Sequence, residues 1–352
     1  MEGYVDRSHS HPNFDHADSS AHCEPFELDL HPPSRRIRQI WAVGGGKGGV
    51  GKSLIASSLA ISISQAGRRV VAVDLDLGGA NLHTTLGLDL PRATLSDFLT
   101  SRATSIESCL LPTDINGLQV ISGAQDSVSA ANISDSEKVR LMRSLISLDT
   151  DYLILDLGAG TASHTMDFFL ASDIPIVTLL PEPTSIENAY RFIRTAYYRH
   201  LACSRRIGEE AKALVRLAMD GKNSAGINTP SDLFREVSRR YPEAGIQLKK
   251  EIERFQPKVL VNQARTQNDI DIGTAVKTVC KRYFGIEVDY LGFLEHDNAV
   301  WQAVRRKRPV ALEFPKSRLV LTLNSLAQKI MRAQHPAEPT IGAPFSTMTR
   351  AE

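Results

Sequence analysis

Residues 46–53 read GKGGVGKS, and this glycine-rich run constrains the fold more than any other part of the sequence. The apolar run IRQIWAV (37–43) precedes it and is typical of a buried strand. Residues 52–67 repeat apolar side chains at helical spacing and end on Gly67, a common helix C-terminal residue. A strand, a glycine loop and a helix in this order fit the pattern G-x-x-x-x-G-K-[ST] and predict a phosphate-binding loop (P-loop).

The residue types in this loop suit the recognition of a triphosphate. Glycines let successive backbone N–H groups curve around phosphate oxygens, and the helix N-terminus adds positive potential. Lys52 is expected to neutralise the β- and γ-phosphates, and Ser53 to bind Mg²⁺. We therefore expect ATP and Mg²⁺ as cofactors. The loop residues predicted to bind the nucleotide are Gly46, Lys47, Gly48, Gly49, Val50, Gly51, Lys52, Ser53 and Leu54.

Further short apolar runs alternate with helical segments along the chain. Strands that are apolar throughout have no face turned to solvent, so this alternation favours an α/β fold with a mostly parallel, twisted sheet and helices on both faces. Residues 199–256 lack a convincing strand and predict a helical insertion with Leu248, Ile252 and Phe255 on one face. A last amphipathic helix is expected over 317–333. The apolar runs lie at 68–76, 118–122, 151–157, 174–180, 257–262 and 288–293.

The composition is that of an ordinary globular protein whose charge is unevenly distributed. Its 41 basic and 40 acidic side chains give a formal charge of +1, which excludes a strongly basic nucleic-acid coat as the whole molecule. Residues 1–33 hold seven acidic side chains and one arginine, without helical or strand periodicity. We predict a disordered acidic, His-rich arm at 1–36, a P-loop ATPase domain at 37–333 and a flexible tail at 334–352.

The four cysteines are scattered and form no C-x-x-C pair, so the sequence supports neither a disulfide framework nor an iron–sulfur site. The chain opens without the pattern of a signal peptide, and no stretch reaches the roughly 18 apolar residues that span a bilayer. We expect a cytoplasmic protein.

The glycine loop and three later segments together resemble the MinD/ParA family of dimerising P-loop ATPases. The loop is similar to that family's deviant Walker A motif because Lys47 follows its first glycine. The segments DLDLGGANLHTTLG (74–87) and DLGAGT (156–161) look like the family's two switch segments, and LLPEPTSIENAY (179–190) matches a further family segment. The similarity covers about 37–198 and 257–333, so it also implies the P-loop NTPase form of the α/β fold.

The resemblance implies a catalytic set of Lys47, Lys52 and Asp76. Lys47 would reach across a nucleotide-sandwich homodimer to the partner's phosphates, where it would stabilise charge as an arginine finger does. Asp76 would orient or activate the attacking water. Phosphoryl transfer needs little covalent help, so positioned carboxylates, lysines and one metal ion suffice.

The resemblance also implies ligands for the metal and the base. Ser53, Asp74 and Asp156 would hold Mg²⁺, although an Asp at a strand end, such as Asp74, is also a common cap or turn residue. Asn262 closes the run PKVLVN at the expected carboxyl edge of the sheet and resembles the family's adenine-contacting Asn.

Within the family, residues 290–318 look more like the FlhG/FleN regulators of flagellar number and position than like ParA, with MinD close behind. The resemblance implies an ATP-dependent dimerisation switch that slowly hydrolyses ATP to ADP and phosphate, stimulated by a partner or by dimerisation. It would position a cellular structure such as the flagellum or the division site.

Two alternatives stay open at this stage. A ParA-like DNA-partitioning ATPase would use the basic run Arg305–Arg308 as its footprint, whereas an interaction scaffold would bind a protein partner through the insertion. The basic run also suits a peripheral position at the inner face of the plasma membrane, although residues 334–352 lack a basic amphipathic helix. The same run is also explained by a solvated helix end, where cations interact favourably with the negative C-terminal end of the helix dipole.

Overall fold

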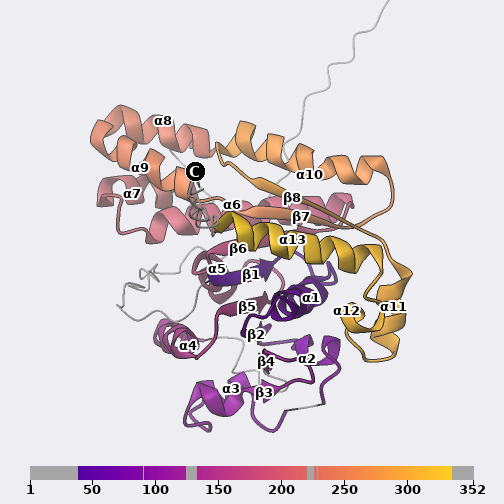
Figure 1. Cartoon of the computed structure of the whole chain (residues 1–352). Helices are drawn as coiled ribbons and strands as arrows, with labels where there is room; N and C mark the ends of the chain where they lie inside the picture. The colour runs from indigo at the N-terminus through magenta and orange to yellow at the C-terminus, as the bar shows by residue number, and fades with distance from the viewer. Residues whose placement is uncertain (1–38, 90, 124–132, 220–225, 228, 335–352) are drawn as a thin grey trace, which may run out of the picture.

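The computed structural model describes residues 39–89, 91–123, 133–219, 226–227 and 229–334 (Figure 1). The predicted arm at 1–36 and the predicted tail beyond Gln334 lie outside these residues. The described strands form one eight-stranded sheet in the order β3-β4-β2-β5-β1-β6-β7-β8. They are β1 (Gln39–Gly44), β2 (Val70–Leu75), β3 (Leu111–Pro112), β4 (Leu118–Ile121), β5 (Tyr152–Leu157), β6 (Ile174–Leu179), β7 (Lys258–Ala264) and β8 (Asp289–Glu295).

The sheet confirms the predicted fold class. Neighbouring strands are parallel except for the edge pair β3 and β4, which are antiparallel. Each apolar run named from the sequence forms a strand at nearly the predicted bounds. The sequence reading missed only β3 among the described strands, because a two-residue strand is too short to show a periodicity.

Helices cover both faces of the sheet (Figure 1). One face carries α1 (Lys52–Gln65), α2 (Leu82–Thr85), α11 (Asn298–Arg305), α12 (Val310–Glu313) and α13 (Arg318–Gln334). The other face carries α3 (Leu95–Leu99), η1 (Ile106–Cys109), α4 (Asp135–Ser147), α5 (Ser163–Leu170), α6 (Pro183–Cys203), α7 (Glu209–Met219), α8 (Pro230–Arg240), α9 (Pro242–Arg254), α10 (Gln267–Val279) and η2 (Cys280–Phe284).

The central strand β1 separates two hydrophobic cores. Ile40 and Ala42 belong to one core, whereas Trp41 and Val43 belong to the other, because successive side chains of a strand point to opposite faces. All four side chains are fully buried. A strand buried on both sides has to be apolar at every position, which is the pattern of the sequence run.

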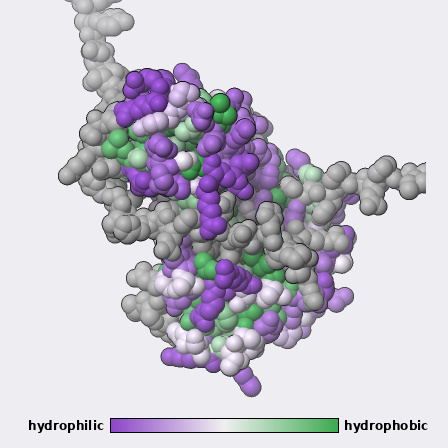
Figure 2. Space-filling model, turned by 90° about the vertical axis from the view of Figure 1, so that its left-hand side faces the viewer, coloured by the Kyte–Doolittle hydropathy of each residue, from purple (hydrophilic) through white to green (hydrophobic). Residues whose placement is uncertain are grey.

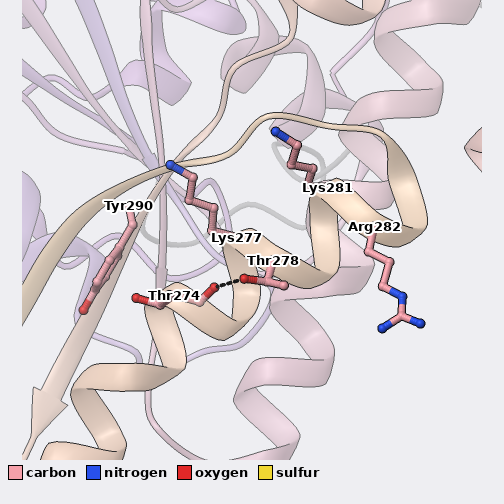
Figure 3. Close-up of a pocket in the computed structure, with 6 residues that line it drawn as sticks. All are labelled: Thr274, Lys277, Thr278, Lys281, Arg282 and Tyr290. Atoms are coloured by element: carbon pink, nitrogen blue, oxygen red, sulfur yellow. Dashed lines mark hydrogen bonds between the residues drawn. The ribbon is translucent and has the colours of Figure 1, made fainter.

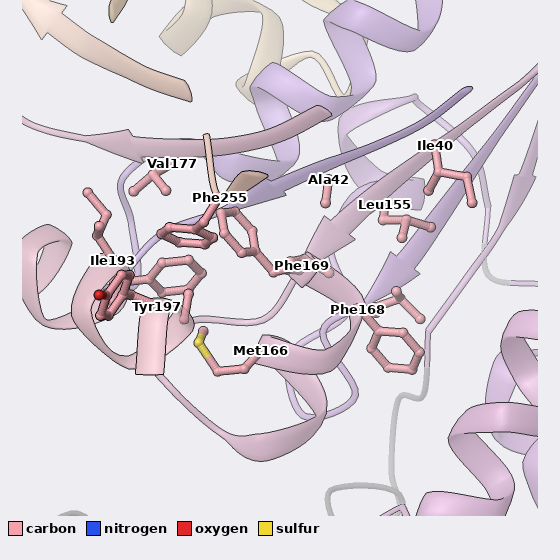
Figure 4. Packing of buried hydrophobic residues seen from close by; sticks show 14 of the residues in the cluster. Ile40, Ala42, Leu155, Met166, Phe168, Phe169, Val177, Ile193, Tyr197 and Phe255 are labelled. Carbon is pink, nitrogen blue, oxygen red and sulfur yellow. The ribbon is translucent and has the colours of Figure 1, made fainter. Parts of the chain in front are cut away.

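Helices α7, α8 and α9 occupy the segment that the sequence predicts as a helical insertion. Its apolar face packs on the core of the same chain: Leu248 and Phe255 are buried, and the Phe255 ring lies 6.0 Å from the Tyr197 ring between centroids (Figure 4). Figure 2 shows the side of the molecule that carries these helices, with hydrophilic and hydrophobic residues intermixed on its upper part. The predicted face is therefore a core face of this chain.

The last helix, α13, contacts α1 and β8. The apolar stripe predicted from the sequence is buried there: Leu319, Leu323, Leu326 and Ile330. None of the helices within the described residues combines the length and the apolar character that crossing a bilayer requires.

Candidate nucleotide-binding site

The glycine-rich loop connects the carboxyl end of β1 to the first turn of α1. Gly51 is the N-cap of α1 with a φ of 93°, and no side chain caps the first turn. The N–H groups of that turn thus face the loop, as anion binding at a helix N-terminus requires. The loop is also tightly packed: a Cβ on Gly51 would lie 2.4 Å from Nδ2 of Asn262, and one on Gly46 would lie 2.1 Å from the carbonyl oxygen of Asn188.

The sheet register brings two of the predicted carboxylates next to this loop. In the pairing of β5 with β1, Asp156 lies opposite Val43, the residue before the strand's last glycine. In the pairing of β5 with β2, Asp156 lies opposite Asp74. The carboxyl ends of parallel strands meet at one sheet edge, which is where open α/β sheets bind their ligands.

Asp156 is a buried carboxylate whose oxygens accept no hydrogen bond from the described residues. Its side chain is 1 % exposed, and neither carboxylate oxygen has a hydrogen-bond partner among the described residues. Burial raises the pKa of Asp156 well above its usual range, and Asp74 acts in the same direction, while the nearby Ser53 and Lys52 oppose both. Buried polar groups normally have partners, so an orphaned carboxylate at a loop of this kind indicates a ligand.

Lys52 complements this carboxylate. Its side chain is buried, and burial lowers the pKa of its ammonium, while Asp156 and Asp76 act to raise it. Its Nζ donates a long hydrogen bond of 3.5 Å to the carbonyl oxygen of Lys47. The arrangement suits a ligand that brings phosphate oxygens to Lys52 and a divalent cation to Asp156.

The two aspartates of the first switch segment have different surroundings. Asp74 is buried and accepts hydrogen bonds from the backbone N–H groups of Asp76 (3.0 Å) and Leu82 (2.9 Å). Burial raises the pKa of Asp74 to about 6, and these two hydrogen bonds act to lower it. Asp74 therefore holds the segment that follows β2 in shape, which is the cap role left open from the sequence. Its direct contact with a metal ion stays a prediction.

Asp76 is only partly buried and faces the second switch segment. A Cβ on Gly158 would lie 3.4 Å from its Oδ1. Its carboxylate thus lies at the mouth of the site, between the two switch segments. This place is compatible with the predicted role in orienting water.

Lys47 lies at the surface, in contrast to the buried Lys52. Its Nζ is 3.3 Å from Oγ1 of Thr184 and 3.7 Å from Oε2 of Glu182, and its side chain is 41 % exposed. Glu182 and Thr184 stand at the start of α6, within the segment 179–190 already noted for its family resemblance. Their contact with the loop lysine was missed, since no local pattern links residues that far apart.

Asn262 braces the loop from β7. It is buried, its Nδ2 donates to the carbonyl oxygen of Val50 (2.9 Å), and its Oδ1 accepts from the N–H of Gln263 (2.9 Å). The sequence thus identified a residue at the loop, and the structure gives it a positioning role. A contact with adenine stays a prediction that requires this side chain to exchange partners.

The residues present fit a magnesium ion. Mg²⁺ in nucleotide sites is commonly held by one or two protein oxygens together with phosphates and water. Ser53 and the orphaned Asp156 can supply those oxygens, and within the described ranges no group of three or more His, Cys, Asp or Glu side chains forms a separate metal cluster. When bound, Mg²⁺ would neutralise and polarise the phosphates.

A hollow of about 610 Å³ lies away from this edge, beside α10 and β8 (Figure 3). Lys281 on its rim is paired with Glu287 at 2.6 Å. None of the predicted nucleotide-binding residues lines it. The lining residues are Thr274, Lys277, Thr278, Lys281, Arg282 and Tyr290.

A parallel sheet with a glycine loop between β1 and α1, a buried loop lysine and an orphaned strand-end aspartate together define a P-loop NTPase. A family model described as ParA, "NUBPL iron-transfer P-loop NTPase", matches residues 36–198. Antiactivator FleN of Pseudomonas aeruginosa is 28 % identical over 304 residues, which cover 86 % of this chain and 89 % of FleN. These matches confirm the resemblance of the chain to the ParA/MinD family of P-loop NTPases.

Two relatives from Helicobacter pylori match a shorter stretch. Septum site-determining protein MinD is 31 % identical over 155 residues, which cover 44 % of this chain and 57 % of MinD. Flagellum site-determining protein YlxH is 36 % identical over 162 residues, which cover 44 % of this chain and 52 % of YlxH. These relatives agree with the FleN-like and MinD-like resemblance of the sequence.

The solved structures support the same fold. MinD of Pyrococcus horikoshii in complex with Mg-ADP superimposes with a TM-score of 0.57 at 20 % identity, covering 84 % of this chain and 97 % of that one. MinD of Pyrococcus furiosus superimposes with a TM-score of 0.56 at 21 % identity, covering 84 % and 100 %.

Proposed function

We propose that this protein is an ATP-dependent dimerisation switch that hydrolyses ATP to ADP and phosphate and thereby positions a cellular structure such as the flagellum or the division site. Relatives named as septum site-determining and flagellum site-determining proteins support the positioning role. The proposal includes a cytoplasmic location and a protein partner that stimulates an otherwise slow hydrolysis.

The observation that carries the proposal is the different placement of the two lysines in one loop. Lys52 is buried beside Asp156, where it can bind the phosphates of its own nucleotide. Lys47 lies at the rim, where its side-chain contacts with the described residues are an exposed ion pair with Glu182 and one hydrogen bond to Thr184. Exposed ion pairs contribute little, about 0–1 kcal/mol, so Lys47 can leave these partners at small cost and contact a second subunit.

The chemistry follows from the positions of these side chains. Lys52 and the loop N–H groups bind the phosphates, and Ser53 and Asp156 would hold Mg²⁺. Asp76 orients a water whose oxygen attacks the γ-phosphorus, while the bond to the β–γ bridging oxygen breaks and ADP leaves. Lys47 of the second subunit would stabilise the charge that develops, so hydrolysis is slow until the dimer forms.

Light scattering and phosphate release, with ADP and with ATP, test the proposal on three variants. Asp76→Ala should dimerise with ATP and hydrolyse it at least about a hundredfold more slowly. Lys47→Ala should bind ATP but stay monomeric. Lys329→Ala removes an exposed lysine of α13 and should behave as the wild type.

An Asp76→Ala variant that binds ATP but stays monomeric would sink the dimerisation switch. A Lys47→Ala variant with unchanged dimerisation and turnover would remove the proposed role of Lys47.

A further inference from the structure

Helices α11 and α12 form a basic corner of the molecule that the nucleotide site does not use (Figure 1). Residues 298–318 contain six basic side chains and a single acidic one, Glu313. Helix α11 turns Ala299, Val300 and Ala303 toward the hydrophobic core under it. Its opposite face, which carries Trp301 and Val304, is therefore left to solvent.

This outer face is apolar as well as basic. Trp301 is 61 % exposed and lies one helical turn before Arg305, and Val304, directly before Arg305, is 55 % exposed. The Arg305 guanidinium lies 4.8 Å from the centre of the Trp301 ring. Leu312, on the adjoining α12, is 44 % exposed. We call this surface, made of Trp301, Val304, Arg305, Lys307 and Leu312, the α11 corner.

The positive charge of the α11 corner is only partly neutralised. Glu313 forms an ion pair with Arg306. Its Oε2 also lies 3.9 Å from Nη1 of Arg308. Within the part of the chain that the structure describes, Arg305 and Lys307 have no carboxylate partner. Two cations without a counter-ion thus flank exposed tryptophan, valine and leucine side chains.

We propose that the α11 corner is a contact surface for an anionic lipid bilayer. A solvated helix end explains the cations but not the three exposed apolar side chains. Tryptophan with an apolar body and a polar edge favours the headgroup region of a membrane, and neighbouring Lys and Arg side chains are attracted to anionic lipid. Duplex DNA would satisfy the cations but would leave Trp301, Val304 and Leu312 without an apolar partner.

Vesicle sedimentation combined with tryptophan fluorescence tests the surface directly. The chain has two tryptophans: Trp41 is fully buried in β1, so changes in emission report Trp301. The full-length protein should sediment with vesicles of phosphatidylcholine mixed with phosphatidylglycerol and much less with phosphatidylcholine alone. Emission should shift to the blue and become protected from iodide quenching, and high salt should reverse both effects.

Two pairs of variants separate this corner from the rest of the surface. Arg305→Glu combined with Lys307→Glu should weaken binding to the anionic vesicles about tenfold or more, and Trp301→Ser should weaken it by a smaller factor. Matched changes on α9, at the far side in Figure 1, are Lys249→Glu combined with Lys250→Glu, and Ile246→Ser at a residue that is also 61 % exposed. These controls should bind as the wild type does.

Equal binding by the wild type and the corner variants, or no binding to anionic vesicles with or without ATP, overturns the proposal. Binding to duplex DNA instead of vesicles, lost in the Arg305 and Lys307 double variant, would assign the corner to nucleic acid and overturn it as well. Dimerisation with ATP is measured on the same samples. Loss of the lipid result with intact dimerisation therefore refutes this inference alone and leaves the proposed function standing.

Discussion

Two carboxylates that are buried in different parts of the molecule differ in their charged and hydrogen-bonding partners. Asp156, at the nucleotide edge of the sheet, has no hydrogen-bond partner among the described residues. Glu251, on α9 of the insertion, is equally buried, but its Oε2 accepts a hydrogen bond of 2.7 Å from Nη1 of Arg254, and its Oε1 lies 3.2 Å from Nε2 of His200. Nη1 of Arg206 lies 3.7 Å from Oε1 of Glu251.

The acidities of the two groups diverge accordingly. Burial acts to raise the pKa of both carboxylates. At Asp156, the neighbouring Asp74 raises the pKa further, whereas at Glu251 the adjacent His200 and Arg254 outweigh burial and lower the pKa to about 2. Glu251 joins α9 to His200 of α6, whereas Asp156 has no hydrogen-bond partner among the described residues, as we expect of a carboxylate that binds a ligand.

The largest expected effect comes from a third buried carboxylate, Asp167 on α5, which belongs with Glu251 in this comparison. It contacts Nζ of Lys138 and Nε of Arg199, each at 2.5 Å, and so joins α4, α5 and α6. Asp167→Ala should lower the free energy of unfolding by about 3–5 kcal/mol, because two largely buried cations lose their shared anion. Urea denaturation measures the loss, and a change below about 1 kcal/mol would remove Asp167 from the partnered class.

The next effect separates function from stability at Asp156. Asp156→Asn should slow ATP hydrolysis about a hundredfold, or about 2.7 kcal/mol, since the ligand-facing charge is lost. The same variant should unfold at a higher urea concentration than the wild type. Phosphate release and urea denaturation at pH 7 measure the two changes, with the exposed Asp114→Asn as a control that alters neither.

The size of this stability change depends on pH. The pKa of Asp156 is raised in the folded protein, so its folded state binds the proton more tightly and loses stability as the pH rises through that pKa. The stabilisation of Asp156→Asn over the wild type should therefore grow with pH. A variant that is less stable than the wild type at every pH would mean that Asp156 has a stabilising partner.

The smallest of the three effects is expected at Glu251. Glu251→Gln should lower the free energy of unfolding by about 1–2 kcal/mol, since Arg254 and Arg206 are half exposed and water replaces part of the lost interaction. The pKa of Glu251 is lowered in the folded protein. Its contribution is therefore present above the ordinary value of 4.5 and is lost as the pH falls toward about 2. Urea denaturation of the wild type and the variant across this pH range measures the effect, and ATPase activity should be unchanged. A difference in unfolding free energy that does not vary with pH would contradict the prediction.

The fold followed from the sequence to a large extent because its strands are buried on both faces. The runs Ile40–Val43 in β1 and Tyr152–Leu155 in β5 are continuously apolar, which is the pattern of a strand buried on both faces. The sequence did not predict the edge strand β3, because this strand has two residues and, within the described sheet, pairs with β4 alone. The apolar face of the insertion was visible from its spacing, but its contact with Tyr197 depended on how α6 and α9 pack.

Some features of the candidate site were likewise predictable from local sequence, and others required the tertiary structure. Lys52 and Ser53 were identified because phosphate recognition depends on a few consecutive residues. The cap role of Asp74 and the bracing role of Asn262 required the structure, since each depends on which backbone groups lie within reach. Residue type at a strand end indicates that a side chain is available for chemistry, but not which partner it has.

The sequence by itself determined the phosphate loop, the strand-end carboxylates and the alternation of strands and helices, because each depends on residues that are neighbours in the chain. Only the tertiary structure decided which charged groups are partnered. Lys47 meets Thr184 across 137 positions, and Asn262 meets Val50 across 212. Asp156 has no partner among the described residues, and that depends on how distant segments pack around the end of β5. Packing, not local pattern, therefore distinguished a carboxylate without a hydrogen-bond partner among the described residues from one that holds the fold together.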